Sequence, residues 1–310
     1  MISRGLLMKK ALTFGILSSC FFSFTFILNR SMNLGGGYWM WSSPLRYLIT
    51  LPFMAMVLLF RPGMGMKAIR AVFVEIKKNP ISWILWSTVG FGFFYFPLTL
   101  ASVFGEAWMT ASSWEITIVA GVLLTPLFGK KIPIKTVLLS GLIIIGVFVM
   151  QIPNMTSTNT IGNMVALIPI VIAAISYPLG NRKMMQVCPN GFDTMQRIFG
   201  MLVCSTPFWI IVSIIAFATG GAPSGGQLGQ SVAVAIFSGI IATSLFFQAT
   251  NLVKDNPREL GVIEATQCGE VIFSLLGGVL FLGDNIPTAW GFIGIILIIV
   301  GMVLNSIAAS

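Results

Sequence analysis

Two glutamates, Glu115 and Glu270, lie deep inside long apolar stretches of the sequence and are the first candidates for chemistry. Each is about ten residues from the end of its stretch, which would place it near the centre of a lipid bilayer. A charged side chain there costs at least about 2.5–3.5 kcal/mol, so such residues are rare and tend to be functional. Carboxyl groups held away from water also bind protons more tightly than in water. The pair therefore predicts a site that exchanges protons or cations.

The alternative is that each glutamate is a structural acid, either protonated or paired with Arg46 or a backbone amide. The other acidic residues are poorer candidates, because they lie in links, at membrane edges or close to the ends of apolar stretches. They are Glu75, Asp193, Asp255, Glu259 and Asp284 in links or at edges, and Glu106 and Glu264 near the ends of stretches.

Arg46 is the third charged residue of interest, about seven positions into the apolar stretch 39–60. Its guanidinium could bind a carboxylate of a substrate, or it could neutralise Glu115. It could also reach back to the membrane surface along its flexible stem. The sequence leaves these three alternatives open.

Polar and aromatic side chains accompany these charged residues. Some share a helix face with one of the glutamates, one adjoins Glu115, and one lies in the stretch 81–102. They are Trp108, Ser112, Trp114, Tyr95, Gln267 and Ser274. A carboxylate between aromatic walls would suit a lipophilic cation. Aromatic residues also gather at both surfaces of a membrane without binding anything, which is the alternative for each of them.

Metal, cofactor and nucleophile chemistry find little support in the sequence. There is no histidine, which removes imidazole ligands and the Ser-His-Asp arrangement. The four cysteines, Cys20, Cys188, Cys204 and Cys268, have no CxxC spacing, so they predict neither a metal site nor a disulfide framework. No Walker motif is present, so ATP is not expected to drive the protein directly. We expect no cofactor and no bound metal.

The composition indicates the environment of the chain. Of its 310 residues, 56% are hydrophobic and only 9% are charged, whereas soluble domains have about 25% charged residues. The apolar residues come in blocks of close to 20, about the length that crosses a bilayer. The net charge of +9 comes from basic residues between these blocks rather than along one face, so we do not expect nucleic-acid binding.

Breaks in the apolar pattern predict ten membrane-spanning helices. Glycine and proline clusters mark the short links, and the longest link, about 61–80, is basic and suits a short helix on the membrane surface. The predicted spans are 11–28, 39–60, 81–102, 106–128, 134–152, 161–180, 195–219, 231–251, 260–282 and 287–307.

The basic residues test this count. Fifteen of the 18 lysines and arginines fall in the N-terminal segment and in alternate links, while the remaining links hold essentially Arg30 alone. Cytoplasmic loops of membrane proteins carry such an excess. One miscounted span would invert every later link and destroy the alternation. The pattern therefore predicts ten spans with both termini in the cytoplasm.

The two halves of the chain show weak similarity at an offset near 154 residues. Four features, which give five matched positions, recur in the same order: the Asn-Arg endings of spans 1 and 6, a glycine in spans 3 and 8, a glutamate in spans 4 and 9, and a Gly-x-x-Ile-Pro segment. The matched positions are Asn29 with Asn181, Arg30 with Arg182, Gly90 with Gly239, Glu115 with Glu270, and Gly129 with Gly283. We predict two repeats, 1–155 and 156–310. Because each has five spans, the second would enter the membrane from the opposite side, as in many secondary transporters.

These features together resemble the drug/metabolite transporter superfamily in its ten-helix, EamA-like form, over nearly the whole chain. The resemblance rests on the Asn-Arg endings, on Arg46 and on the glycine-rich third and eighth spans. The segment 111–121, ASSWEITIVAG, is similar to the branch of multidrug resistance efflux transporters. One departure is that the related four-helix multidrug transporters use a glutamate in their first helix, whereas span 1 here has no acid. Their proton-binding role therefore cannot be transferred by position.

We accordingly expect an all-helical integral membrane protein that exports a small organic molecule, driven by proton entry, through alternating access to a midplane site. An uncoupled exporter or uniporter of metabolites or amino acids is the main alternative. A membrane-embedded enzyme, or an assembly partner or sensor, is more remote. The expected partners are the substrate and the lipid bilayer of a bacterial cell membrane. The sequence leaves monomer and homodimer open.

Overall fold

The computed structural model describes residues 4–63, 65–129, 131–132, 134–155, 167–189 and 191–309. Every regular element within these ranges is helical. Eight helical stretches are long and apolar enough to cross a membrane: Gly5–Leu34, Trp39–Phe60, Pro80–Phe104, Ile134–Pro153, Thr194–Gly220, Gly225–Val253, Arg258–Leu282 and Ala289–Ala308. The protein is therefore a multi-pass integral membrane protein, as its composition predicts.

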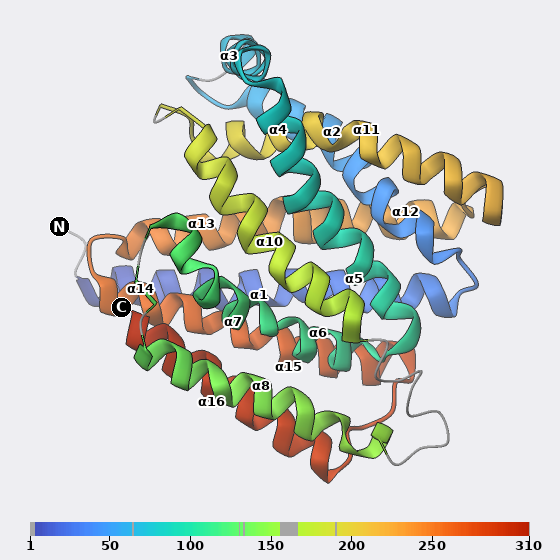
Figure 1. Cartoon of the computed structure of the whole chain (residues 1–310), viewed down its shortest axis with the longest axis vertical. Coiled ribbons are helices and arrows are strands. Elements are labelled where there is room, and N and C mark those ends of the chain that lie inside the picture. The colour runs from blue at the N-terminus through green and yellow to red at the C-terminus, as the bar shows by residue number, and fades with distance from the viewer. Residues whose placement is uncertain are drawn as a thin grey trace.

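The helices follow one another with short links (Figure 1). Up to residue 155 they are α1 (Arg4–Leu34), α2 (Ser42–Phe60), α3 (Gly65–Lys78), α4 (Pro80–Ser87), α5 (Phe93–Phe104), α6 (Ala107–Trp114), α7 (Ile116–Leu123) and α8 (Ile134–Met155). After residue 166 they are α10 (Leu167–Val187), α11 (Thr194–Gly220), α12 (Gly225–Val234), α13 (Thr243–Val253), α14 (Pro257–Ala265), α15 (Gly269–Gly277) and α16 (Ala289–Ala309).

The predicted count of ten spans is met only in part. The predicted span 106–128 is interrupted, because α6 and α7 have eight residues each and a 3₁₀ turn, Thr125–Phe128, follows them. About 20 residues are needed for one unbroken span. The predicted span 161–180 lies partly outside the described residues, and its described part begins with α10. The number ten remains a prediction.

Three spans contain π-helical segments, in which the backbone bonds reach one residue further than in an α-helix. They are Thr88–Gly92 between α4 and α5, Ala235–Ala242 between α12 and α13, and Gly278–Leu282 after α15. Such segments often occur at functional sites. The first surrounds Gly90 and the second surrounds Gly239, the two glycines that match in the predicted repeats.

Helices of the two halves of the chain pair with one another. α8 packs along α16, and α2 packs along α11. α1 contacts α13 and α15 of the second half, while α10 contacts α5 and α7 of the first half (Figure 1). Through these contacts the helices of both halves form one bundle.

The largest core cluster joins α2, α5 and α11 through aromatic rings. The rings of Tyr47 and Trp209 stack with their centroids 4.6 Å apart, and Tyr95 meets Tyr47 edge-on at 5.5 Å. Trp83 and Trp209 are fully buried. Large apolar side chains also cover the outside of the bundle, as on Ile211, Ile214 and Phe217 of α11, which suits a surface that faces lipid.

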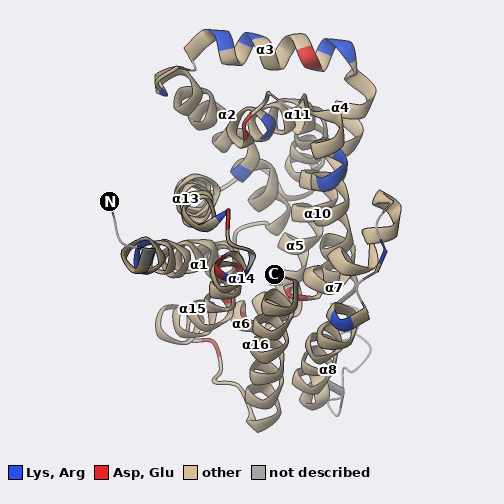
Figure 2. Cartoon of the chain, turned by 90° about the vertical axis from the view of Figure 1, so that its left-hand side faces the viewer, with Lys and Arg blue, Asp and Glu red and all other residues tan. Residues whose placement is uncertain are grey.

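Both termini lie at the same end of the bundle (Figure 1). Figure 2 looks onto this end, where Lys and Arg positions are spread over several helices, and we call it the basic end. α3 lies along the top edge of this view and contacts α2, α11 and α4 (Figure 2). A helix was predicted in this link. Ala68 and Val72 of α3 are buried, whereas Lys67 and Arg70 are exposed.

Candidate functional site

Glu115 lies at the break between α6 and α7, not on an unbroken helix. Its backbone N–H bonds to Ser112 O at 3.3 Å, which is a 3₁₀-type bond, and the hydroxyl of Ser112 donates to Trp108 O at 2.7 Å. Serine hydroxyls that bond to the preceding turn favour a bend in a helix, and this bond lies directly before the break. The side chain of Glu115 is 4% exposed, so its carboxyl group is held inside the protein.

Glu270 lies at a similar irregularity in the ninth predicted span. A 3₁₀ turn, Thr266–Cys268, separates α14 from α15, and Glu270 is the second residue of α15. The hydroxyl of Thr266 donates to Ile263 O at 2.6 Å, again a bond to the preceding turn. Glu270 is partly buried. Each predicted acid thus occupies a discontinuity in its span, a feature that hydropathy alone does not predict.

The two acids are close enough for their charges to repel each other, and Glu270 also interacts electrostatically with Arg46. Neither acid forms a salt bridge with another residue that the structure describes. The ion pairs between described residues are Arg30 with Asp284, Arg61 with Asp193, and Lys78 with Glu75. Neutralisation of Glu115 by direct contact with Arg46, one of the alternatives from the sequence, is therefore not what the structure contains.

Arg46 points into the bundle. Its Nη1 donates to Thr25 Oγ1 at 3.3 Å and its Nη2 donates to Ser238 Oγ at 3.0 Å. The two hydroxyl oxygens are 2.7 Å apart and share a hydrogen bond. Thr25 belongs to α1 and Ser238 to the π-helical segment Ala235–Ala242. The guanidinium is therefore bonded between helices of the bundle, which favours the alternatives in which Arg46 acts inside it.

The ring of Tyr95 packs against the guanidinium of Arg46. The guanidinium carbon of Arg46 lies 4.1 Å from the centroid of the Tyr95 ring, an arrangement in which the π-electrons attract the cation. The Tyr95 hydroxyl accepts a hydrogen bond from Asn29 Nδ2 at 3.0 Å, and the side chain is fully buried. Four residues from four elements, Thr25, Arg46, Tyr95 and Ser238, therefore form one assembly, which we call the arginine cluster.

The remaining predicted residues are more dispersed. Trp108 donates from Nε1 to Asn285 O at 3.1 Å and packs in a separate apolar cluster with Met150. Gln267 Nε2 contacts Gly15 O of α1 at 3.5 Å. Ser112 and Ser274 are completely buried. Arg46 and Tyr95 are thus in direct contact, Glu115 and Glu270 each lie at an interruption of a span, and Trp108 packs in a different apolar cluster.

Tyr177 of α10 is a candidate that the sequence analysis missed. Its ring lies 5.6 Å from that of Trp114 and 4.8 Å from that of Phe94. It also interacts electrostatically with Glu270 and Arg46, so it faces the same group of charges. Two fifths of its surface is exposed. Tyr177 was missed because its predicted span contains no acidic residue. The one sequence feature that marks it is its position directly before Pro178.

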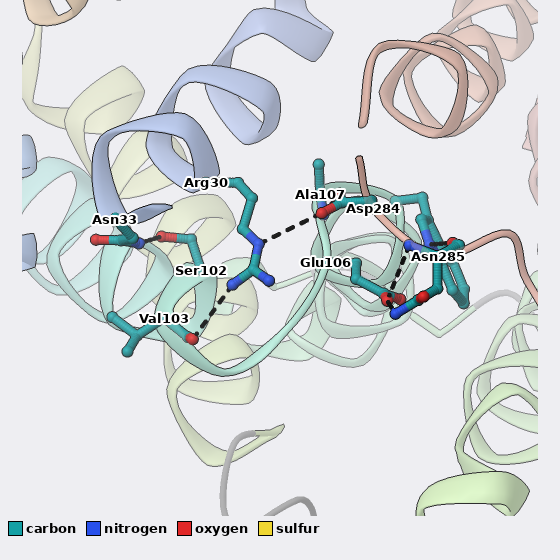
Figure 3. Close-up of polar contacts among 9 residues, drawn as sticks. Arg30, Asn33, Ser102, Val103, Glu106, Ala107, Asp284 and Asn285 are labelled. Atoms are coloured by element: carbon teal, nitrogen blue, oxygen red, sulfur yellow. Dashed lines mark hydrogen bonds and ion pairs between the residues drawn. The ribbon is translucent and has the colours of Figure 1, made fainter. Parts of the chain in front are cut away.

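A polar network joins the two halves at the end opposite the termini (Figure 3). Arg30 of α1 pairs with Asp284 at 3.5 Å, and Asp284 also accepts the backbone N–H of Ala107 at 2.9 Å. Glu106 accepts from Asn285 Nδ2 at 2.8 Å. The network ties the end of α1, the start of α6 and the link after residue 282 to one another, and we call it the distal network.

The comparison with known proteins places the chain among transporters. Residues 9–310 match the family described as "Putative multidrug resistance efflux transporter" (EmrE). The chain is 43% identical over 314 residues to "Uncharacterized protein YjlA" of Bacillus subtilis (strain 168), covering 97% of this chain and 95% of that protein. It is 41% identical over 278 residues to the "Uncharacterized 42.1 kDa protein in intracellular alkaline protease 3'region" of Shouchella clausii, covering 86% and 71%.

The fold also resembles a solved structure named "Crystal structure of protein". The TM-score is 0.62 at 13% sequence identity, and the match covers 97% of this chain and 98% of the other. At this identity the likeness concerns the fold alone.

Proposed function

The chain belongs to the multidrug resistance efflux transporter family, and on this premise we propose that it is a secondary active transporter, which exports a small organic molecule in exchange for protons. The observation that carries the proposal is the pair Glu115 and Glu270. These two acids lie within the membrane-spanning bundle, lack a salt bridge to any described residue, and are close enough to repel each other.

Repulsion between the acids supplies the coupling. Two carboxylates held near each other are difficult to ionise together, so the site retains a positive charge in the form of a proton or a cationic group of the substrate. Entry of the substrate group releases protons, and return of protons releases the substrate. A proton gradient would then drive export without any cofactor.

Inverted repeats would let the site open alternately to each side. Features that recur in both halves support repeats over 1–155 and 156–310. Gly129 and Gly283 both take the left-handed conformation, with φ of 73° and 69°, and each ends a span that is interrupted near its glutamate. The π-helical segments around Gly90 and Gly239 are a second recurrence. On this basis the interrupted span α6–α7 and the span containing α10 would raise the eight apolar stretches to ten membrane spans.

The orientation follows from charge. Basic residues are enriched on the cytoplasmic side of membrane proteins, so we assign the basic end, with both termini, to the cytoplasm. The distal network then faces the outside. The relatives from Bacillus subtilis and Shouchella clausii support a place in a bacterial cell membrane.

The test is flux into proteoliposomes under an imposed pH gradient, with a panel of organic cations and metabolites. Glu115→Gln and Glu270→Gln keep the size of each side chain and remove its charge. We expect each to lower gradient-driven flux by about tenfold or more, because loss of one charged contact is worth at least about 1.4 kcal/mol. Glu75→Gln on α3 is the matched control and should transport normally.

Three results would contradict the proposal. Normal flux in both variants would remove the acids from the coupling. Flux that persists but ignores the gradient would favour an uncoupled uniporter. Chemical conversion of a lipid or solute without transport would favour an enzyme.

A further inference from the structure

Arg46 presents an unneutralised positive charge inside a bundle that spans the membrane. Such a charge is expensive in this environment, so intramembrane arginines pair with an anion or line a substrate path. Among the described residues no carboxylate lies within 4 Å of Arg46, and its contacts are two neutral hydroxyls and the Tyr95 ring. Nothing in the described part of the protein balances the charge by direct contact.

We infer that Arg46 binds an anionic group of the substrate, so that the transported molecule is a small zwitterion rather than a simple lipophilic cation. The inference rests on the proposed function, because it names the class of molecule that occupies the same site.

The guanidinium retains the capacity to bind a carboxylate. Arginine has five N–H donors in a planar fork, which matches the two oxygens of a carboxylate. Thr25 and Ser238 accept one bond each from the terminal nitrogens, which leaves the other donors without a bond to any described residue. The side chain is also partly exposed rather than sealed in the core.

The arginine cluster fixes the guanidinium in place before any ligand arrives. The hydroxyls of Thr25 and Ser238 bond to each other as well as to Arg46, and the buried Tyr95 ring lies under the guanidinium. Asn29 in turn holds the hydroxyl of Tyr95. A binding group that is ordered in advance loses little entropy when it binds, so this is the construction expected of a recognition residue.

The charges around Arg46 point to the rest of the ligand. Glu270 interacts electrostatically with Arg46, yet no salt bridge joins them, so the site has a positive and a negative pole that are separated. A zwitterion fits both poles, with its anionic group on Arg46 and its ammonium facing Glu270. A simple cation would be repelled by Arg46 and would leave the positive charge of Arg46 without a partner.

The inference is tested by measuring how much two matched pools of small molecules raise the melting temperature of the purified protein. One pool holds the common amino acids, and the other holds their amides, which keep the side chain and the ammonium but lose the negative charge. We expect at least one amino acid to bind, and its amide to bind about 10- to 100-fold more weakly. In Arg46→Gln the affinity for the acid should fall to that for the amide.

Two further variants control for folding and for charge. Arg46→Lys keeps the positive charge and should retain part of the preference for the acid. Arg258→Gln removes an exposed charge at the start of α14 and should behave as the original protein. Amides that bind as tightly as acids, absence of binding by every acid, or a preference that survives in Arg46→Gln would each overturn the inference.

Flux of ethidium under a pH gradient separates this inference from the proposed function. If gradient-driven flux of ethidium depends on Glu270 while no acid binds, the inference is wrong and the proposed function stands. If neither ethidium nor any pool member is transported, both are wrong.

Discussion

Tyr95 acts on the ligand through Arg46 and does not have to touch the ligand itself. Its ring supports the Arg46 guanidinium at 4.1 Å, and Asn29 bonds to its hydroxyl. We predict that Tyr95→Leu, which removes the ring face, weakens ligand binding at Arg46 by about 0.5–2 kcal/mol. Tyr95→Phe should keep the binding, since the ring remains, but should lower the melting temperature because Asn29 is left without its partner.

Isothermal titration with the best acid from the pools measures the first effect, and thermal unfolding in detergent measures the second. If the Leu and Phe variants bind the acid equally well, Tyr95 does not act through its ring.

For single residues, the sequence predicts which charged side chains matter but not which residues hold them in place. Glu115, Glu270 and Arg46 could be predicted because a charge within an apolar stretch is conspicuous. Thr25 and Ser238 could not, because hydroxyl residues are common in membrane helices. Their role arises only when α1 packs on the segment Ala235–Ala242, a long-range contact that no local pattern encodes.

Among the elements, the pairing of α8 with α16 depends on two glycines that face each other. A Cβ on Gly146 would meet the carbonyl oxygen of Gly294, and a Cβ on Gly294 would meet that of Gly146. We predict that Gly294→Ala forces these backbones apart and lowers stability by about 1–3 kcal/mol. Gly141→Ala, in the same α8 but with nothing within 4 Å of the added methyl group, is the control. Thermal unfolding that drops equally in both variants would contradict the prediction.

The helix α3 leads to a prediction about lipids. It has buried residues on one side, exposed Met66 and Phe73 next to them, and basic residues beyond, a pattern typical of a helix in the membrane interface. Each basic residue near an anionic membrane surface contributes about 1 kcal/mol. We therefore predict that anionic lipid raises the melting temperature of the reconstituted protein.

The variant for this test combines Lys67→Gln, Arg70→Gln and Lys77→Gln, three exposed positions of α3. The variant should lose most of the stabilisation by phosphatidylglycerol and behave as the original protein in phosphatidylcholine. An undiminished response to phosphatidylglycerol would place the lipid contact elsewhere.

The extents of several spans could be predicted from hydropathy alone. The stretch 39–60 coincides with Trp39–Phe60, and 195–219 differs from α11 by one residue at each end. α1 extends beyond the predicted 11–28 at both ends, because Lys9, Lys10 and Asn29 are helical although they are polar. The break at Glu115 escaped prediction, since hydropathy does not register whether a backbone bond reaches three or four residues back.

Different polar contacts join the two halves of the molecule at its two ends. The distal network joins α1, α6 and the link after residue 282 through Arg30, Glu106, Asp284 and Asn285 (Figure 3). At the basic end, Arg61 pairs with Asp193 at 2.6 Å and joins α2 to the start of α11. Asn305 Nδ2 also donates to Thr136 O at 3.2 Å at this end, so polar contacts hold the two halves together at both ends. The sequence predicts the two halves from recurring residues but not which of their polar residues meet.

These contacts at the two ends predict how variants shift access to the site. Asp284→Asn removes the charge that holds both Arg30 and the N–H of Ala107, so it should favour conformations open at the distal end. Arg61→Gln should favour the opposite opening. Cys268 reports access, because it is partly exposed and close enough to Glu115 to interact with it electrostatically.

The measurement is the rate at which a membrane-impermeant thiol reagent, applied from the distal side, labels Cys268 in a protein whose other cysteines are replaced by serine. Loss of a partly buried ion pair and its accompanying hydrogen bond is worth about 1–3 kcal/mol, so Asp284→Asn should raise the rate by about 5- to 150-fold. Arg61→Gln should lower it. Because both variants remove one charge, a parallel change in the two rates would mean general loosening of the bundle, and only opposite changes agree with two alternately open states.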